Sequence, residues 1–128
     1  MRDLVIHLHG EGFERAYQAL TLAASARSAG QAVAVVLAFG ALRALAEDRL
    51  GDPMPGPDLW TAKRAELRGA PPIAQLLASA RALGVAFWAS DAVADMTGVD
   101  PDQLTGKVAR VSLPQIVERQ QQAQVLYL

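Results

Sequence analysis

The sequence predicts an α/β fold, a three-layer sandwich with a mostly parallel sheet of about five strands and helices on both faces. Short apolar runs rich in β-branched residues alternate with longer segments whose apolar residues recur at helical spacing, which is the pattern of βαβ units. One run, residues 33–38, is apolar at every position, as is typical of a strand covered on both faces. The 128 residues suffice for one core, and we expect a single domain over 1–128.

The first half of the chain predicts two strand–helix pairs and an irregular segment. Residues 4–8 form a strand that ends in the turn 9–12, and helical spacing begins at Phe13 and ends at Gly30. After the strand 33–38, apolar residues within 42–50 predict a second helix that Gly51 ends. The prolines within 52–57 exclude regular structure there. Asp58 is then expected to cap a short helix that runs through Arg68.

The second half predicts three more strands. An amphipathic helix over 73–83 ends at Gly84, and the strand 85–89 follows with Phe87 and Trp88 on opposite faces. A helix then begins at Ala92, and Asp100 with Pro101 indicates the start of another. Residues 107–111 form a weak strand, a last helix extends from 112 to about 121, and residues 124–128 close the sheet.

Composition excludes several classes of protein. The net charge is −1 and no basic block exists, which disfavours direct binding to nucleic acid. The absence of cysteine removes disulfides, thiolate metal sites and cysteine nucleophiles. No apolar stretch reaches the roughly 18–20 residues of a membrane span, and the first residues lack the pattern of a signal peptide. We therefore expect a cytoplasmic protein.

A ligand pocket is expected at the carboxyl ends of the strands, where open α/β sheets place their sites. The residues at these ends are His9, Gly10, Gly12, Phe39, Gly40, Ser90 and Asp91. Arg15 or Arg43 would assist in holding a small anion. An alternative for Ser90 or Asp91 is to cap the following helix, because both residue types are favoured caps. No cofactor is expected, since Arg15 stands where a dinucleotide fingerprint needs its third glycine.

Two further arrangements would make the protein an enzyme. His7 and His9 share one face of a strand and have metal-ligand spacing, with Glu11, Glu14 or Asp91 as a possible third ligand. Ser90 would be a nucleophile if His9 lay within hydrogen-bond reach. The alternative is that His7 is a packed, hydrogen-bonded core residue and that His9 is a polar residue at a strand end.

The chain resembles the DsrE/DsrF-like family over nearly its whole length. The resemblance rests on the segments Gly12-Phe13-Glu14-Arg15-Ala16, 30–39, 84–85 and Met96-Thr97-Gly98-Val99. This family includes sulfur-relay subunits of tRNA thiolation and of bacterial sulfur oxidation. Its active members carry a cysteine about eight residues before the glycine that ends the short helix. Counting back from Gly98, that position is Ser90, so the resemblance does not carry over the sulfur transfer.

The family forms dimers, trimers or hexamers, so the resemblance implies a homo-oligomer, or a hetero-oligomer with a DsrE-like homologue. We expect the segment 52–72 and the apolar end Tyr127-Leu128 to contact a neighbouring subunit, and Trp60 and Trp88 to be core or interface anchors. The preferred function is a non-catalytic, small-ligand-binding or accessory subunit of a sulfur-relay-type system. The alternatives are an enzyme that uses His7, His9 and Ser90, and a purely structural oligomer subunit.

Overall fold

A single parallel sheet of five strands organises the computed structural model, which describes residues 2–128. The strand order is β4-β3-β2-β1-β5 and every pair is parallel. The strands are β1 (Asp3–Leu8), β2 (Val33–Leu37), β3 (Ala86–Ser90), β4 (Ala109–Val111) and β5 (Ala123–Tyr127). The helices are α1 (Phe13–Ser28), α2 (Phe39–Ala46), α3 (Pro57–Leu67), α4 (Ile73–Leu83), α5 (Asp91–Thr97), α6 (Pro101–Leu104) and α7 (Leu113–Gln120). The predicted α/β fold is confirmed.

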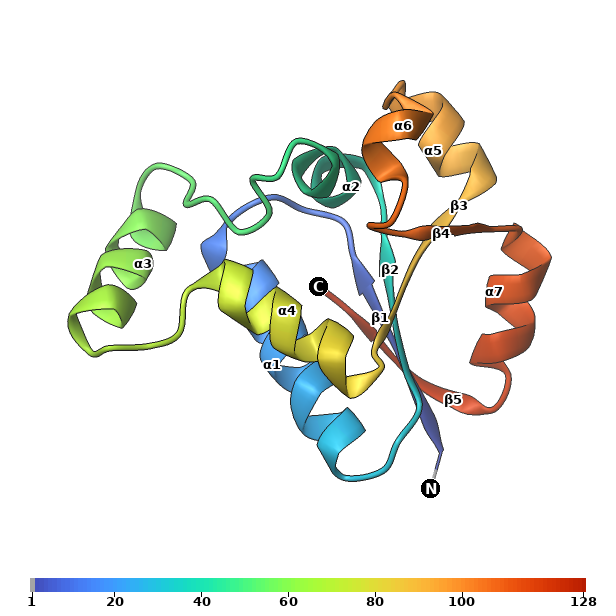
Figure 1. Cartoon of the computed structure of the whole chain (residues 1–128), viewed down its shortest axis with the longest axis horizontal. Coiled ribbons are helices and arrows are strands. Elements are labelled where there is room, and N and C mark those ends of the chain that lie inside the picture. Colours follow the sequence, from blue (N-terminus) through green and yellow to red (C-terminus); the bar gives the residue numbers. More distant parts are fainter. Residues whose placement is uncertain (1) are drawn as a thin grey trace.

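Helices cover the two faces of the sheet unequally (Figure 1). α1 and α4 pack together on one face, and α7 lies on the other. α2, α5 and α6 gather beyond the carboxyl ends of the strands, and α3 projects away from the body. Within residues 2–128, no helix combines the length and the apolarity that a membrane crossing requires.

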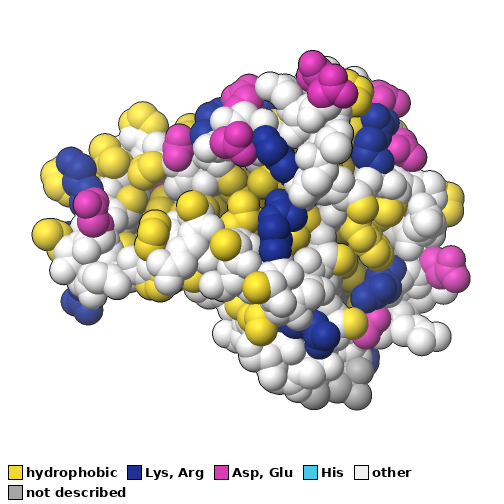
Figure 2. Space-filling model, in the orientation of Figure 1, with side chains coloured by type: hydrophobic (Ala, Val, Ile, Leu, Met, Phe, Trp, Pro, Cys, Tyr) yellow, Lys and Arg dark blue, Asp and Glu magenta, His cyan; other side chains and the backbone are white. Residues whose placement is uncertain are grey.

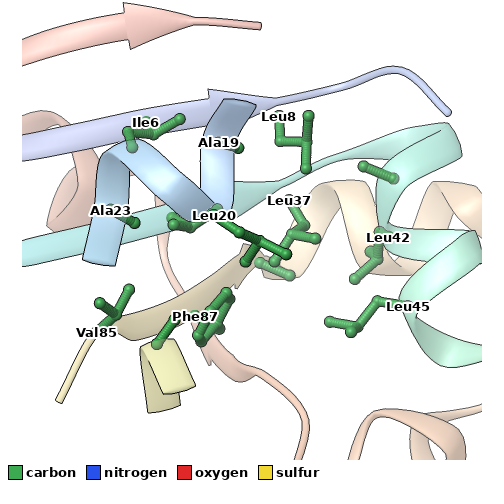
Figure 3. Close-up of a cluster of buried hydrophobic side chains, with 14 of the residues drawn as sticks. Ile6, Leu8, Ala19, Leu20, Ala23, Leu37, Leu42, Leu45, Val85 and Phe87 are labelled. Carbon is green, nitrogen blue, oxygen red and sulfur yellow. The ribbon is translucent and has the colours of Figure 1, made fainter. Parts of the chain in front are cut away.

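The main core lies between the sheet and helices α1, α2 and α4 (Figure 3). Ile6 and Leu8 of β1 point into it, and the small residues Ala19 and Ala23 let α1 approach the sheet closely. Each large apolar side chain buried here contributes about 1.5–3 kcal/mol to the free energy of unfolding. The other face holds a smaller cluster around Val5, Val36 and Ile116. All five residues of β2 are buried, as its apolar sequence predicts for a central strand.

Strand boundaries differ from the expectation by one or two residues, and three differences concern the helices. α2 begins at Phe39 and ends at Ala46, earlier than the predicted 42–50, because Asp48 adopts a left-handed backbone with φ of 56°. α5 begins at Asp91, one residue before the predicted Ala92. Asp58 does not cap its own helix: it lies in the first turn of α3, after Gly56 and Pro57.

The two tryptophans differ in their surroundings. Trp88 is half-buried and packs against the smaller cluster beside α7, which agrees with the core alternative of its prediction as a core or interface anchor. Trp60 was predicted to be a core or interface anchor. It is 62% exposed on α3, so the core alternative is wrong.

Candidate functional site

Ser90 lies at the carboxyl end of β3 and caps helix α5. Its Oγ accepts a hydrogen bond from the backbone N–H of Val93 at 3.1 Å, and the residue is only 3% exposed. The capping interpretation therefore describes its place in the fold. A hydroxyl that is buried and already hydrogen-bonded offers little access to a reagent in solution.

Asp91 forms an ion pair with a neighbouring strand. Its Oδ1 accepts a hydrogen bond from Arg110 Nε at 3.0 Å, and Arg110 Nη2 also donates to Asp95 Oδ1 at 2.9 Å. Arg110 belongs to β4, so this pair ties the first turn of α5 to the neighbouring strand. Both carboxylates are exposed, and an ion pair at such a surface adds little to stability.

The N-terminus of α1 is capped by a carboxylate from α3. Asp58 accepts hydrogen bonds from the backbone N–H groups of Phe13 and Glu14 at 2.8 Å and of Met54 at 2.7 Å. Burial alone would raise the pKa of Asp58, but these three donors stabilise the carboxylate and lower the pKa below its ordinary value. This helix end is therefore already occupied by an anionic group of the chain itself.

Gly12 makes room for that carboxylate. Its φ is +114°, a value that side chains rarely adopt, and an added Cβ would lie 3.0 Å from Asp58 Oδ2. Gly12 was expected to line a ligand pocket. The structure places it instead under the contact between α3 and α1.

A hollow of about 560 Å³ lies beside the ends of β1 and β2. Of the predicted ligand residues, Gly10 and Gly40 line it. Glu11 at its wall is paired with Arg49 at 3.0 Å. Arg15 and Arg43 also line it, and within residues 2–128 neither forms an ion pair. Phe39 begins α2 with a left-handed backbone and an exposed ring, and it does not line this hollow.

An aromatic cluster lies between β1 and β5, where the order of the strands reverses. The ring of His7 stacks on Tyr127 with centroids 4.7 Å apart, and His9 approaches both rings edge-on at 6.0 and 6.3 Å. His7 Nε2 is hydrogen-bonded to Gln120 Oε1. Burial lowers the pKa of His7, the bond to Gln120 opposes this change, and nearby His9 lowers the pKa further. His7 is thus a packed, hydrogen-bonded residue, as one interpretation of the sequence predicts.

The structure does not bring together the residues that the enzyme hypotheses need. β2 separates β1 from β3, so the strand that leads to His9 and the strand that ends at Ser90 lie about 10 Å apart at ordinary strand spacing. The Ser90 hydroxyl is hydrogen-bonded to the N–H of Val93, and no hydrogen bond within residues 2–128 joins it to His9. Asp91 is engaged with Arg110 on the far side of Ser90. Within residues 2–128, no three side chains of the His, Cys, Asp and Glu types gather in an arrangement that would hold a metal ion.

A largely apolar cavity was not expected from the sequence. It measures about 660 Å³ and lies between α3 and the body. Its walls come from the segment 48–53, from α3 and from the start of α4, with Leu45, Leu50, Ile73 and Leu77 among its apolar lining residues. The prolines within 52–57 and at positions 71 and 72 were the only signal for it, because they predicted irregular stretches on either side of a short helix.

The comparisons with known proteins agree with this fold. The crystal structure of the ychN protein from E. coli is 21% identical with a TM-score of 0.68, and the match covers 100% of both chains. A protein of unknown function from Methanobacterium thermoautotrophicum is 18% identical with a TM-score of 0.60, again over 100% of both chains. A conserved protein of unknown function from Bacteroides thetaiotaomicron is 11% identical with a TM-score of 0.58, over 97% of this chain and 94% of that chain.

At these identities the structural likeness concerns the fold alone. No functionally curated protein matches the chain. A sequence model of the DsrE/DsrF-like family, in contrast, matches residues 3–128. The match spans all five strands and the segment that contains Ser90, and it bears out the resemblance seen in the sequence. The chain therefore belongs to the DsrE/DsrF-like family.

Proposed function

We propose that this protein is a non-catalytic accessory subunit of a DsrE/DsrF-like assembly, and that it works in the cytoplasm. The observation that carries the proposal is Ser90. It stands at the position where the sequence resemblance puts the family's cysteine, the chain has no cysteine elsewhere, and the Ser90 hydroxyl is buried in a helix cap. A serine in this setting cannot carry a persulfide, so the contribution of this subunit is contact rather than sulfur transfer.

The arm, defined as residues 52–72, supports an assembly. Its helix α3 has no buried residue, and it exposes Leu59, Trp60 and Leu67, of which Leu67 is 87% exposed. Figure 2 shows hydrophobic side chains gathered over this part of the molecule. Asp58 holds the arm in place through its bonds to α1. An ordered projection with apolar side chains in water is typical of a surface that contacts another protein.

Small-ligand binding is a second candidate function. The hollow at the ends of β1 and β2 offers two arginines without ion pairs, Arg15 and Arg43, and its volume lies in the range of small-molecule sites. The carboxylates of Glu11, Glu14 and Asp58 also line the hollow, so an anionic group of a ligand would have to lie against the two arginines. Purified protein that retains such a ligand should lose it in the Arg43→Ala variant and keep it in Arg64→Ala, which removes an exposed arginine of α3.

The accessory role is tested by mixing this protein with a cysteine-bearing relative. The purified protein is combined with a cysteine-bearing DsrE/DsrF-like protein from the same organism, and the mixture is analysed by native mass spectrometry. We expect complexes of this chain with itself or with that partner. The proposal is contradicted if the chain remains a monomer both alone and in the mixture.

A further inference from the structure

Strand β5 leaves one edge of the sheet unprotected. It pairs with β1 on one side, and none of its residues, Ala123 to Tyr127, is charged. Natural proteins usually protect an open edge with charge, proline or a very short strand. The opposite edge follows this rule, because β4 has three residues and carries Arg110, which is paired with two carboxylates.

The bonds between β5 and β1 determine which backbone groups face outward. The N–H of Leu128 donates to the carbonyl of His7 at 2.7 Å, and the carbonyl of Leu128 accepts from the N–H of His9 at 3.2 Å. Alternate residues of a strand point their backbone groups to the same side. The N–H and C=O groups of Ala123, Val125 and Tyr127 therefore point away from β1, and within residues 2–128 no strand pairs with that side.

We propose that β5 pairs antiparallel with β5 of a second copy, about a two-fold axis through Val125. This inference rests on the proposed assembly and names one of its contacts. The two-fold axis sets Val125 opposite Val125, and it sets Ala123 of each copy opposite Tyr127 of the other. All three outward-facing residues of one copy thus lie opposite outward-facing residues of the other copy. Their N–H and C=O groups can then hydrogen-bond across the contact. A two-fold axis requires this kind of self-complementary surface.

The side chains fit this register on both faces. On the face of α7, the small Ala123 lies opposite the large Tyr127, which is 67% exposed in the single chain. On the other face, a hollow of about 880 Å³ between α1 and β5 is lined by Leu22 and Leu126 among others. No charged side chains lie opposite each other in this register. If one β5 slid by one residue along the other, outward-facing backbone groups would lie opposite residues whose groups point toward β1.

Single cysteines test the register, because the chain has none of its own. Cα atoms of a hydrogen-bonded antiparallel pair lie about 5.5 Å apart, which a disulfide can span. Val125→Cys should therefore give a covalent dimer, at twice the mass on a non-reducing gel, after mild oxidation. Leu126→Cys is the matched control: it lies on the same strand but faces the other side of the sheet and is paired with Gln124, so it should stay monomeric on that gel.

A second measurement does not depend on the half-buried Val125. Ala123→Cys and Tyr127→Cys are purified separately and then mixed under oxidation. We expect a disulfide dimer in the mixture at a level well above that of either variant alone. Oxidation of Val125→Cys and Leu126→Cys to the same extent, or no dimer in the mixture, overturns the inference. If wild type is an oligomer and these bonds do not form, the β5 contact fails while the accessory role stands. A wild type that is monomeric by itself removes the β5 contact, and the accessory role falls only if the chain also stays monomeric in the mixture with the cysteine-bearing partner.

Discussion

At the scale of single residues, polar groups at the carboxyl edge of the sheet are largely engaged in internal contacts. Ser90 caps α5, Asp58 caps α1, and Asp91 is paired with Arg110. These contacts position the helices above the strand ends. Arg15 and Arg43 lie at this edge and form no ion pair within residues 2–128.

Loss of the Ser90 cap should lower stability without changing the fold. Ser90→Ala removes the partner of the half-buried Val93 N–H, and removal of such a cap typically costs about 1 kcal/mol. Urea unfolding followed by circular dichroism measures this loss. Ser79→Ala, at an exposed position inside α4, should be neutral or slightly stabilising. Equal effects of the two substitutions would show that the hydroxyl of Ser90 contributes nothing as a cap.

The bonds to Asp58 should make stability depend on pH. The pKa of Asp58 is lower in the folded chain than in the unfolded chain, where it is about 3.9. Its contribution is therefore fully present above the unfolded pKa and is lost as the pH falls through the folded pKa. Asp58→Asn should be less stable than wild type by a constant amount at neutral pH and down to about pH 5. The difference should shrink below about pH 4.

Urea unfolding of the two proteins from pH 7 to pH 2.5 checks this expectation. Asp102→Asn, at an exposed position of α6, is the control and should track wild type more closely. A difference between wild type and Asp58→Asn that stays constant to the lowest pH would contradict the assigned role of the carboxylate.

The sequence predicted part of this residue-scale account. Capping by Ser90 follows from a favoured residue type at the start of a helix, which is local information. The role of Asp58 does not follow, because its partners at Phe13 and Glu14 lie more than forty residues away along the chain. The stacking of His7 on Tyr127 depends on the pairing of the first strand with the last, which the strand patterns did not determine.

At the scale of elements, the arm stands apart from the rest of the structure. The other helices pack on the sheet or on its carboxyl end, whereas α3 rests on α1 and projects outward (Figure 1). Periodicity predicted the helices and strands well, because buried faces repeat at fixed spacing. It placed the end of α2 too late, because Leu50 continues the apolar pattern after the backbone has left the helix at Asp48.

Apolar residues of the arm should matter for assembly more than for folding. Trp60 and Leu67 are exposed, so the double substitution Trp60→Ser and Leu67→Ser should change the free energy of unfolding by less than about 1 kcal/mol. The mass of the assembly should fall, as measured by light scattering after size-exclusion chromatography. Leu42→Ser serves as the contrast, since Leu42 is fully buried and its loss should destabilise the chain by several kcal/mol, about 2–5. An unchanged assembly mass in the arm variant would exclude the arm from the contact.

At the scale of the whole molecule, two surfaces have no partner within the described chain: the arm and the outer edge of β5. The arm exposes apolar side chains, and β5 exposes an uncharged strand edge. Both features were expected at subunit contacts from the sequence, through the proline-rich segment and the apolar last residues. The strand order could not be predicted, because hydrophobic patterns identify strands without saying which strands are neighbours.

Sedimentation equilibrium of the untreated wild-type protein at neutral pH measures whether the chain assembles with itself. The chain has a mass of 13.6 kDa. The proposed role as an assembly-forming accessory subunit predicts a mass that is an integral multiple of this value at micromolar concentration. A single species at the mass of one chain over the whole concentration range would contradict self-assembly, and with it the contacts proposed for the arm and for β5.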